Sequence, residues 1–170
     1  MFRTMIAAAA LGSLATPALA QEPVVGVADP EALFTDKDPV IHKNKQATLR
    51  IMRELLQCNH WSDAGKWLTD RYLQHNPNVV SGLAPVMKYF APRPRTPTCD
   101  KLTTPVVAVL ADKDLVAVVI SRTLKHPTEA GKTYTTSWFD MWRFVDGKAD
   151  EHWDGAELFP PRPPAAAPAQ

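Results

Sequence analysis

The sequence has little glycine and almost no excess of charge, and both shortages exclude classes of protein. Seven glycines among 170 residues are too few for a collagen-like chain, and a hydrophobic content of 45% is too high for a chain that is disordered throughout. Nineteen Lys and Arg residues against 18 Asp and Glu give a net charge of +1, so a nucleic-acid partner is not expected. The length suits one domain with its own hydrophobic core.

Familiar catalytic signatures and a second long hydrophobic run are also missing. The chain contains no G-x-S-x-G, no Walker A loop and no Rossmann glycine pattern. A membrane helix needs about twenty uninterrupted apolar residues, and beyond the N-terminal run no segment is long and apolar enough. What remains is a small globular domain whose chemistry must rest on individual side chains.

The first twenty residues have the pattern of a secretory signal peptide. Arg3 supplies a positive start, residues 5–16 form an apolar stretch, and residues 18–20 (Ala-Leu-Ala) form a cleavage site before Gln21. The apolar stretch is short and is followed by Pro17, which disfavours the alternative of a retained membrane anchor. We therefore expect residues 1–20 to be removed, leaving a periplasmic or secreted protein without stable membrane insertion.

The rest of the chain divides into an arm, a folded domain and a tail. Residues 21–39 are polar and punctuated by proline, and the Pro/Ala-rich segment 158–170 is expected to be disordered. Within the domain at 40–157, hydrophobic periodicity predicts helices at 40–58, 62–71 and 82–90, followed by strands at 103–110, 115–123, 132–145 and 148–157. Helices followed by an antiparallel meander predict an α+β fold with the helices on one face of the sheet.

Export changes what the two cysteines indicate. In an oxidising compartment Cys58 and Cys99 are candidates for a disulfide, which could add about 4 kcal/mol of stability. Without a C-x-x-C motif or a nearby pair of histidines they form a poor zinc site. The alternative is two unpaired buried thiols, because sequence does not give their separation.

Two segments resemble a known family. Residues 72–77 (YLQHNP) and 139–154 (FDMWRFVDGKADEHWD) are similar to the SnoaL-like polyketide cyclases, and most of all to the group described as predicted SnoaL-like aldol-condensation enzymes. The resemblance covers about residues 40–157 and extends to the wider nuclear transport factor 2-like superfamily. It implies a cone-shaped α+β barrel, also called cystatin-like, in which a curved sheet wraps around a long helix and leaves a pocket at the open end.

The last predicted hairpin decides which side chains face that pocket. Asp146-Gly147 predicts a two-residue type I′ turn, so that residue 145 pairs with residue 148. Paired residues point to the same face, and this register, which we favour, gives an aromatic face with two carboxylates. Its members are Asp140, Trp142, Phe144, Ala149, Glu151 and Trp153. A one-residue bulge would instead turn His152 and Asp154 inward.

Asp140 is the first candidate for acid–base catalysis. Among tryptophans its carboxylate would lose water, which favours proton exchange near neutral pH; the alternative is a structural carboxylate tied to Arg143, His75 or Tyr72. His75 could carry a proton or orient Asp140, although a lone histidine is more often a structural hydrogen-bonding residue. Tyr72 and Asn76 could donate hydrogen bonds to a substrate carbonyl, or merely close the mouth of the cone.

The remaining candidates would bind substrate. Trp142, Glu151 and Trp153 would line the pocket, and Arg143 could hold a carboxylate, unless it is a solvated or dimer-contact residue. A histidine flanked by Asp150 and Asp154 on one strand is a weak metal pattern, so no metal ion is expected.

Two classes of function follow from these residues and the resemblance. The first is a cofactor-independent lyase, isomerase or cyclase, in which Asp140 removes the proton α to the carbonyl of a small or apolar compound, in an aldol-type reaction. No cofactor is expected, because hydrogen bonds alone can stabilise an enolate. The second is a non-catalytic module, which either binds a small ligand in the same pocket or forms a homodimer through the convex face of its sheet.

Overall fold

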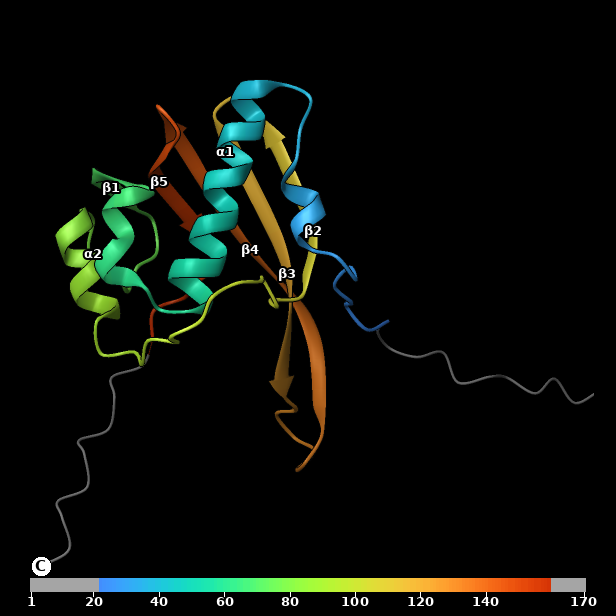
Figure 1. Ribbon diagram of the computed structural model, residues 1–170. Coiled ribbons are helices and arrows are strands. Elements are labelled where there is room, and N and C mark those ends of the chain that lie inside the picture. The colour runs from blue at the N-terminus through green and yellow to red at the C-terminus, as the bar shows by residue number, and fades with distance from the viewer. Residues whose placement is uncertain (1–21, 160–170) are drawn as a thin grey trace, which may run out of the picture.

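The computed structural model describes residues 22–159, so the expected signal peptide and all but the first two residues of the tail lie outside it. Five strands form one sheet in the order β1-β5-β4-β3-β2, with β1 parallel to β5 and all other neighbours antiparallel. The helices lie together on one face of this sheet (Figure 1). The elements in chain order are η1 (Glu31–Phe34), α1 (Pro39–Arg50), η2 (Ile51–Gln57), η3 (Trp61–Lys66), β1 (Leu68–Gln74), α2 (Leu83–Phe90), β2 (Val106–Asp112), β3 (Leu115–Lys125), β4 (Thr133–Val145) and β5 (Lys148–Asp154).

The long helix expected at 40–58 is present as α1 and its continuation η2, a stretch of π-helix. It begins at Asp38, whose carboxylate accepts hydrogen bonds from the backbone N–H groups of Val40 and Ile41. Apolar side chains along one stripe of the helix are buried against the inner face of the sheet and form the hydrophobic core with it. Core residues with almost no exposed area include Ile51, Met52, Leu55, Val116, Val118 and Trp142.

The prediction of a helix at 62–71 is wrong for the second half of that segment. A 3₁₀-helix covers Trp61–Lys66, and the chain then becomes extended as β1 from Leu68. The reason is long-range pairing, because Trp67 C=O accepts a hydrogen bond from Ala149 N–H and Leu68 pairs with Ala149. Sheet pairing with a strand some 80 residues later therefore overrides the local helical pattern. The helix expected at 82–90 is α2, and all four expected strands are present with shifted ends.

The β4–β5 hairpin contains the bulge that the favoured register lacked. The Asp146-Gly147 turn is as predicted, with positive φ at both residues and Val145 paired with Lys148. The register shifts between Arg143 and Phe144, because an extra residue on β5 separates the pairs Phe144–Ala149 and Arg143–Glu151. That residue is Asp150.

Asp150 gives the physical reason for the bulge. Its carboxylate accepts a hydrogen bond of 2.7 Å from the Thr69 hydroxyl and an ion pair from Arg71, both on β1. These two contacts hold the edge strand β1 against β5, and they require the Asp150 side chain to turn toward β1 rather than follow the alternation of the strand. The neighbouring Arg71 holds the pKa of this carboxyl below its usual range.

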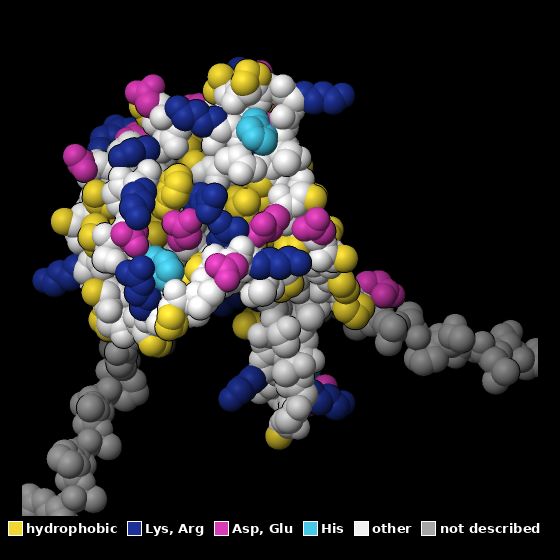
Figure 2. Space-filling view, in the orientation of Figure 1, with side chains coloured by type: hydrophobic (Ala, Val, Ile, Leu, Met, Phe, Trp, Pro, Cys, Tyr) yellow, Lys and Arg dark blue, Asp and Glu magenta, His cyan; other side chains and the backbone are white. Residues whose placement is uncertain are grey.

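A disulfide between Cys58 and Cys99 ties the end of η2 to the loop before β2, with the two Cα atoms 6.1 Å apart. The two cysteines are 41 positions apart in the sequence, and the segment between them includes η3, β1 and α2. Basic and acidic side chains are interspersed over the face seen in Figure 2. Among residues 22–159 no helix has the length and apolar character needed to cross a membrane.

Candidate functional site

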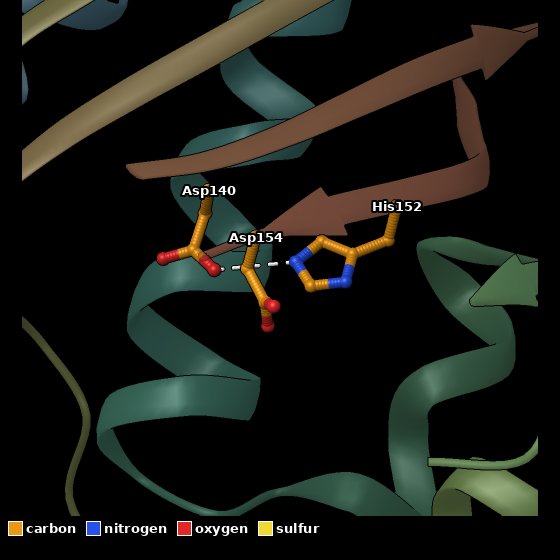
Figure 3. Close-up of side chains that lie close together, drawn as sticks. All are labelled: Asp140, His152 and Asp154. Atoms are coloured by element: carbon orange, nitrogen blue, oxygen red, sulfur yellow. Dashed lines mark hydrogen bonds and ion pairs between the residues drawn. The ribbon is translucent and has the colours of Figure 1, made fainter. Parts of the chain in front are cut away.

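Three ionisable side chains meet on the inner face of the sheet because of the bulge. Asp140 on β4 pairs directly across the strands with Asp154 on β5, and Trp142 pairs with His152. Figure 3 shows Asp140, His152 and Asp154 converging from the two strands. His152 Nε2 lies 3.2 Å from Asp140 Oδ1, and both residues are more than nine-tenths buried. The buried carboxylate that the sequence predicted is thus paired with a histidine, though not with His75.

The second nitrogen of His152 fixes the direction of the hydrogen bonds. His152 Nδ1 lies 2.9 Å from the side-chain oxygen of Gln74, at the end of β1. An amide oxygen only accepts hydrogen bonds, so Nδ1 carries the proton. The pair His152 Nε2 and Asp140 Oδ1 must then hold one further proton between them, on either partner, for the 3.2 Å contact to be attractive.

Asp154 is oriented by a neighbour rather than by the histidine. Asn76 donates a hydrogen bond of 2.7 Å to Asp154 Oδ2, and its own side-chain oxygen accepts from the backbone N–H of Asn78. Asn76 was expected to donate to a substrate carbonyl. Its amide group instead positions Asp154, which makes Asn76 a positioning residue.

The Tyr72 hydroxyl can donate a hydrogen bond to a ligand. The hydroxyl lies in the core beside the dyad of Asp140 and His152, and it accepts a hydrogen bond of 3.1 Å from the indole N–H of Trp142. Burial raises the pKa of this phenol well above its usual range, so it stays protonated at any physiological pH. Among the described residues no acceptor takes the hydroxyl proton, which therefore remains available to a ligand oxygen.

These groups surround a small, partly open cavity of about 70 Å³. Its lining residues include Tyr72, Asp140 and His152, with Trp61 on the helical side. The buried indole N–H of Trp61 has no acceptor among the residues that the structure describes. The volume matches two water molecules, or one carbonyl group with its neighbouring carbon, and is far below the range of about 300–1,000 Å³ that holds a whole ligand.

The other predicted site residues lie on the opposite face, which corrects the favoured register. His75 Nε2 contacts Glu151 Oε1 at 2.8 Å, and its ring stacks on that of Trp153 with centroids 4.9 Å apart. Arg143 donates to Glu151 at 3.1 Å and to Asp114 at 2.8 Å.

This outer group of Arg143, Glu151, Trp153 and His75 is a surface network of charges and rings rather than part of the cavity. Hydrogen bonds from His75 and Arg143 lower the pKa of the Glu151 carboxyl, which stays ionised there.

The inner triad also has the composition of a cation site. Asp140, His152 and Asp154 each offer one ligand atom, and these atoms lie within 4.8 Å of one another. One imidazole and two carboxylates suit a divalent transition-metal ion, and the contact of Nδ1 with Gln74 is the kind of outer hydrogen bond that orients a metal-bound histidine. The same atoms can hold either a shared proton or a cation, but not both.

His152, Asp154 and Gln74 are the candidate site residues that the favoured register missed. The alternative register with one bulge placed His152 and Asp154 inside, and the structure confirms that alternative. Gln74 gave no signal in the sequence, because its role depends on where the edge strand β1 ends beside β5.

Comparison with known proteins gives a family and a fold. The model of the SnoaL-like domain matches residues 49–152, more than half of the chain. A candidate SnoaL-like polyketide cyclase from Jannaschia sp. CCS1 is 17% identical with a TM-score of 0.50, over 71% of this chain and 91% of that one. A candidate polyketide cyclase from Acidithiobacillus ferrooxidans is also 17% identical, with a TM-score of 0.48, over 66% and 86% of the two chains. The comparison with curated proteins finds no match.

Proposed function

Because the chain belongs to the family of SnoaL-like domains, we propose that it is a cofactor-independent acid–base enzyme acting on a small carbonyl compound, as a lyase, isomerase or cyclase. One observation carries this proposal, namely the buried contact of 3.2 Å between Asp140 Oδ1 and His152 Nε2 beside a cavity with unused hydrogen-bond donors. A histidine and a carboxylate that share a proton can both accept and return one, which aldol-type chemistry requires.

The first step is removal of a proton from the carbon next to the substrate carbonyl. In the ionised form of the pair, the His152 imidazolium donates to Asp140 Oδ1, which leaves Oδ2 as the basic oxygen. No described residue bonds to Oδ2, so it is free to take the α-proton. The electron pair of the C–H bond then forms the enolate double bond, and the negative charge moves to the carbonyl oxygen.

The second step uses that enolate. The Tyr72 hydroxyl, kept protonated by burial, donates a hydrogen bond to the enolate oxygen. Trp61 also lines this cavity, and its buried indole N–H has no acceptor among the described residues. In an isomerisation Asp140 returns the proton to another atom. In a cyclisation the enolate carbon attacks a second carbonyl, and Asp140 gives its proton to the alkoxide oxygen that forms. His152 keeps the Asp140 carboxylate in place throughout and is itself fixed by Gln74.

Exchange of the α-proton with solvent tests this function before the substrate is known. Small ketones and 1,3-diketones are incubated in D₂O with the purified protein, and loss of the α-proton signal is followed by ¹H NMR. We expect enzyme-dependent exchange with at least one compound of the panel. Asp140→Asn should slow it by about 10²–10⁴-fold, the usual contribution of a general base.

The matched control is Glu151→Gln, which makes the same change of a carboxylate to an amide in a histidine–carboxylate pair on the outer face. This variant should exchange protons at the rate of the wild type. Equal loss in both variants would show that folding, rather than the inner dyad, determines the rate. Wild-type protein that binds a compound of the panel without exchanging its proton would favour a non-catalytic binding module.

Export is a separate part of the proposal. The disulfide between Cys58 and Cys99 supports it, because such bonds persist mainly in oxidising compartments. The signal-like pattern of residues 1–20 supports it as well. Expression of the full chain in a Gram-negative host, followed by fractionation and mass spectrometry of the intact protein, should give a periplasmic form that starts near Gln21. Uncleaved protein in the cytoplasm or in the membrane would contradict it.

A further inference from the structure

A second, larger hollow lies directly beside the small cavity. This groove has a volume of about 420 Å³ and shares Asn76, Val79 and Phe90 with the cavity, so the two spaces adjoin. Aromatic rings form much of its wall, including those of Phe90, Trp138 and Phe159. Its volume is within the range that holds a small ligand, whereas the cavity takes only a reacting carbonyl group. The body of a bound molecule would therefore lie in the groove.

Two guanidinium groups also line the groove, and both are stacked on its aromatic wall. Arg93 lies over the ring of Phe90 and Arg122 over the ring of Trp138, each with Cζ 4.4 Å from the ring centroid. Stacking occupies the face of a guanidinium and leaves the N–H groups at its edge free to bind an oxyanion. Among the described residues, neither Arg93 nor Arg122 forms an ion pair with a carboxylate. The arginines that do are Arg50, Arg53, Arg71, Arg95 and Arg143.

The sheet register places Arg122 on the same side as the dyad. Val118 is the cross-strand partner of Asp140, and Arg122 follows it four residues along β3, on the same face of the sheet. Four residues of strand span about 13 Å. Since both side chains project over the inner face, one molecule with one or two rings can contact Arg122 at one end and Asp140 at the other.

The charge of the groove limits which anion fits. Glu157, on the segment after β5, is the acidic side chain in its lining, so the two arginines leave a net charge of one positive. A carboxylate carries one negative charge and matches this value. A phosphate group, with about −1.5 to −2 charges at neutral pH, exceeds it and would face Glu157.

We propose that the groove binds the carboxylate of a small aromatic or alicyclic acid through Arg93 and Arg122, so that the substrate is a ring-bearing keto acid. This inference rests on the proposed function only where it assigns a carbonyl at the far end of the molecule. Binding of the acid itself depends on the groove alone.

Isothermal titration with two ligands of the same shape tests the groove. The probes are 2-naphthoate, which carries the carboxylate, and 2-naphthamide, its neutral counterpart, each added to the full mature protein at constant ionic strength. We expect naphthoate to bind at least about tenfold more tightly than naphthamide, the difference that one charge-assisted pair of hydrogen bonds makes. Arg93→Gln and Arg122→Gln should each weaken naphthoate about tenfold and leave naphthamide unchanged.

The matched control is Lys125→Gln, which removes the same charge from the same strand at an exposed position on its other face. It should change naphthoate binding less than twofold. Equal affinity for the two probes, no binding of naphthoate, or equal weakening by Lys125→Gln would each overturn the proposal. Displacement of naphthoate by inorganic phosphate at equal concentration would also overturn the proposal, because the groove would then recognise the negative charge alone and not the ring.

Asp140→Asn separates the two proposals. It should bind naphthoate as the wild type does, even though it no longer exchanges α-protons. If the wild-type protein binds naphthoate selectively but exchanges no α-proton, the proposed carboxylate groove is supported and the proposed enzymatic function is contradicted. If it exchanges α-protons but does not bind naphthoate selectively, the enzymatic function is supported and the carboxylate groove is contradicted.

Discussion

Removal of the Cys58–Cys99 disulfide is a perturbation whose size follows from the structure. The bond closes a loop of 41 residues, and in the chain-entropy relation a loop of this length restricts the unfolded chain by about 4 kcal/mol at 25 °C. Cys58 is buried at the end of η2, so the substitutions should be Cys58→Ala and Cys99→Ala, which bury no new hydroxyl group. For a domain of this size the same free energy corresponds to a fall in Tm of roughly 10–15 °C.

Urea denaturation followed by tryptophan fluorescence measures this effect. The double alanine variant should lose about 4 kcal/mol in its free energy of unfolding, and wild-type protein reduced with dithiothreitol should behave in the same way. The slope m should rise in both, because an unfolded chain without the cross-link exposes more surface. A loss below about 1 kcal/mol, or a loss in the variant that reduction does not reproduce, would refute the reasoning from loop length.

Three further predictions concern the cavity, the bulge and acid stability. Tyr72→Phe should slow α-proton exchange about 10²-fold in the NMR assay while the fold persists, because it removes a donor to the enolate; an unchanged rate would exclude Tyr72 from that role. Asp150→Ala should lower the free energy of unfolding in urea by about 1–3 kcal/mol, since Thr69 loses its acceptor; no change would show that the bulge does not depend on this contact. Hydrogen bonds from Leu102 N–H, from Arg71 and from His75 lower the pKa values of Glu31, Asp150 and Glu151 respectively. Their contribution to stability should therefore be complete above about pH 5. It should begin to fall near the ordinary carboxyl pKa and be lost as the pH drops through the lowered pKa values of the folded state, and Tm values that rise on acidification would contradict this.

Local sequence patterns predicted the parts of the fold that depend on neighbours in the chain. The helix at 40–58 follows from the spacing of apolar residues such as Ile51 and Leu55, which form one buried stripe. The turn at Asp146-Gly147 follows from the preference of these two residues for positive φ, which both adopt. The resemblance to SnoaL-like domains predicted the architecture. Asp140 and Tyr72, two of the candidate site residues proposed from the sequence, both line the cavity.

The parts that could not be predicted depend on contacts between distant residues. The bulge at Asp150 exists because its carboxylate reaches Thr69 and Arg71, 81 and 79 residues earlier in the chain. This single shift decides whether His152 or Glu151 faces the cavity, so it decides the candidate dyad. The strand at 68–74 has the same kind of origin, because its pairing partner β5 lies at the other end of the domain. The hydrophobic periodicity of a single segment reveals neither the bulge at Asp150 nor the pairing of β1 with β5.

The most direct test of the dyad is the protonation state of His152 itself. Long-range ¹H–¹⁵N NMR of the histidine rings, assigned by comparison with His152→Gln, distinguishes a proton on Nδ1 from one on Nε2. The hydrogen bonds to Gln74 and Asp140 predict that Nδ1 is protonated at neutral pH and that its proton exchanges slowly with water, whereas the half-exposed His75 ring exchanges fast. A neutral His152 with its proton on Nε2 and a bare Nδ1, or one that exchanges as fast as His75, would contradict the proton-sharing pair on which the proposed chemistry depends.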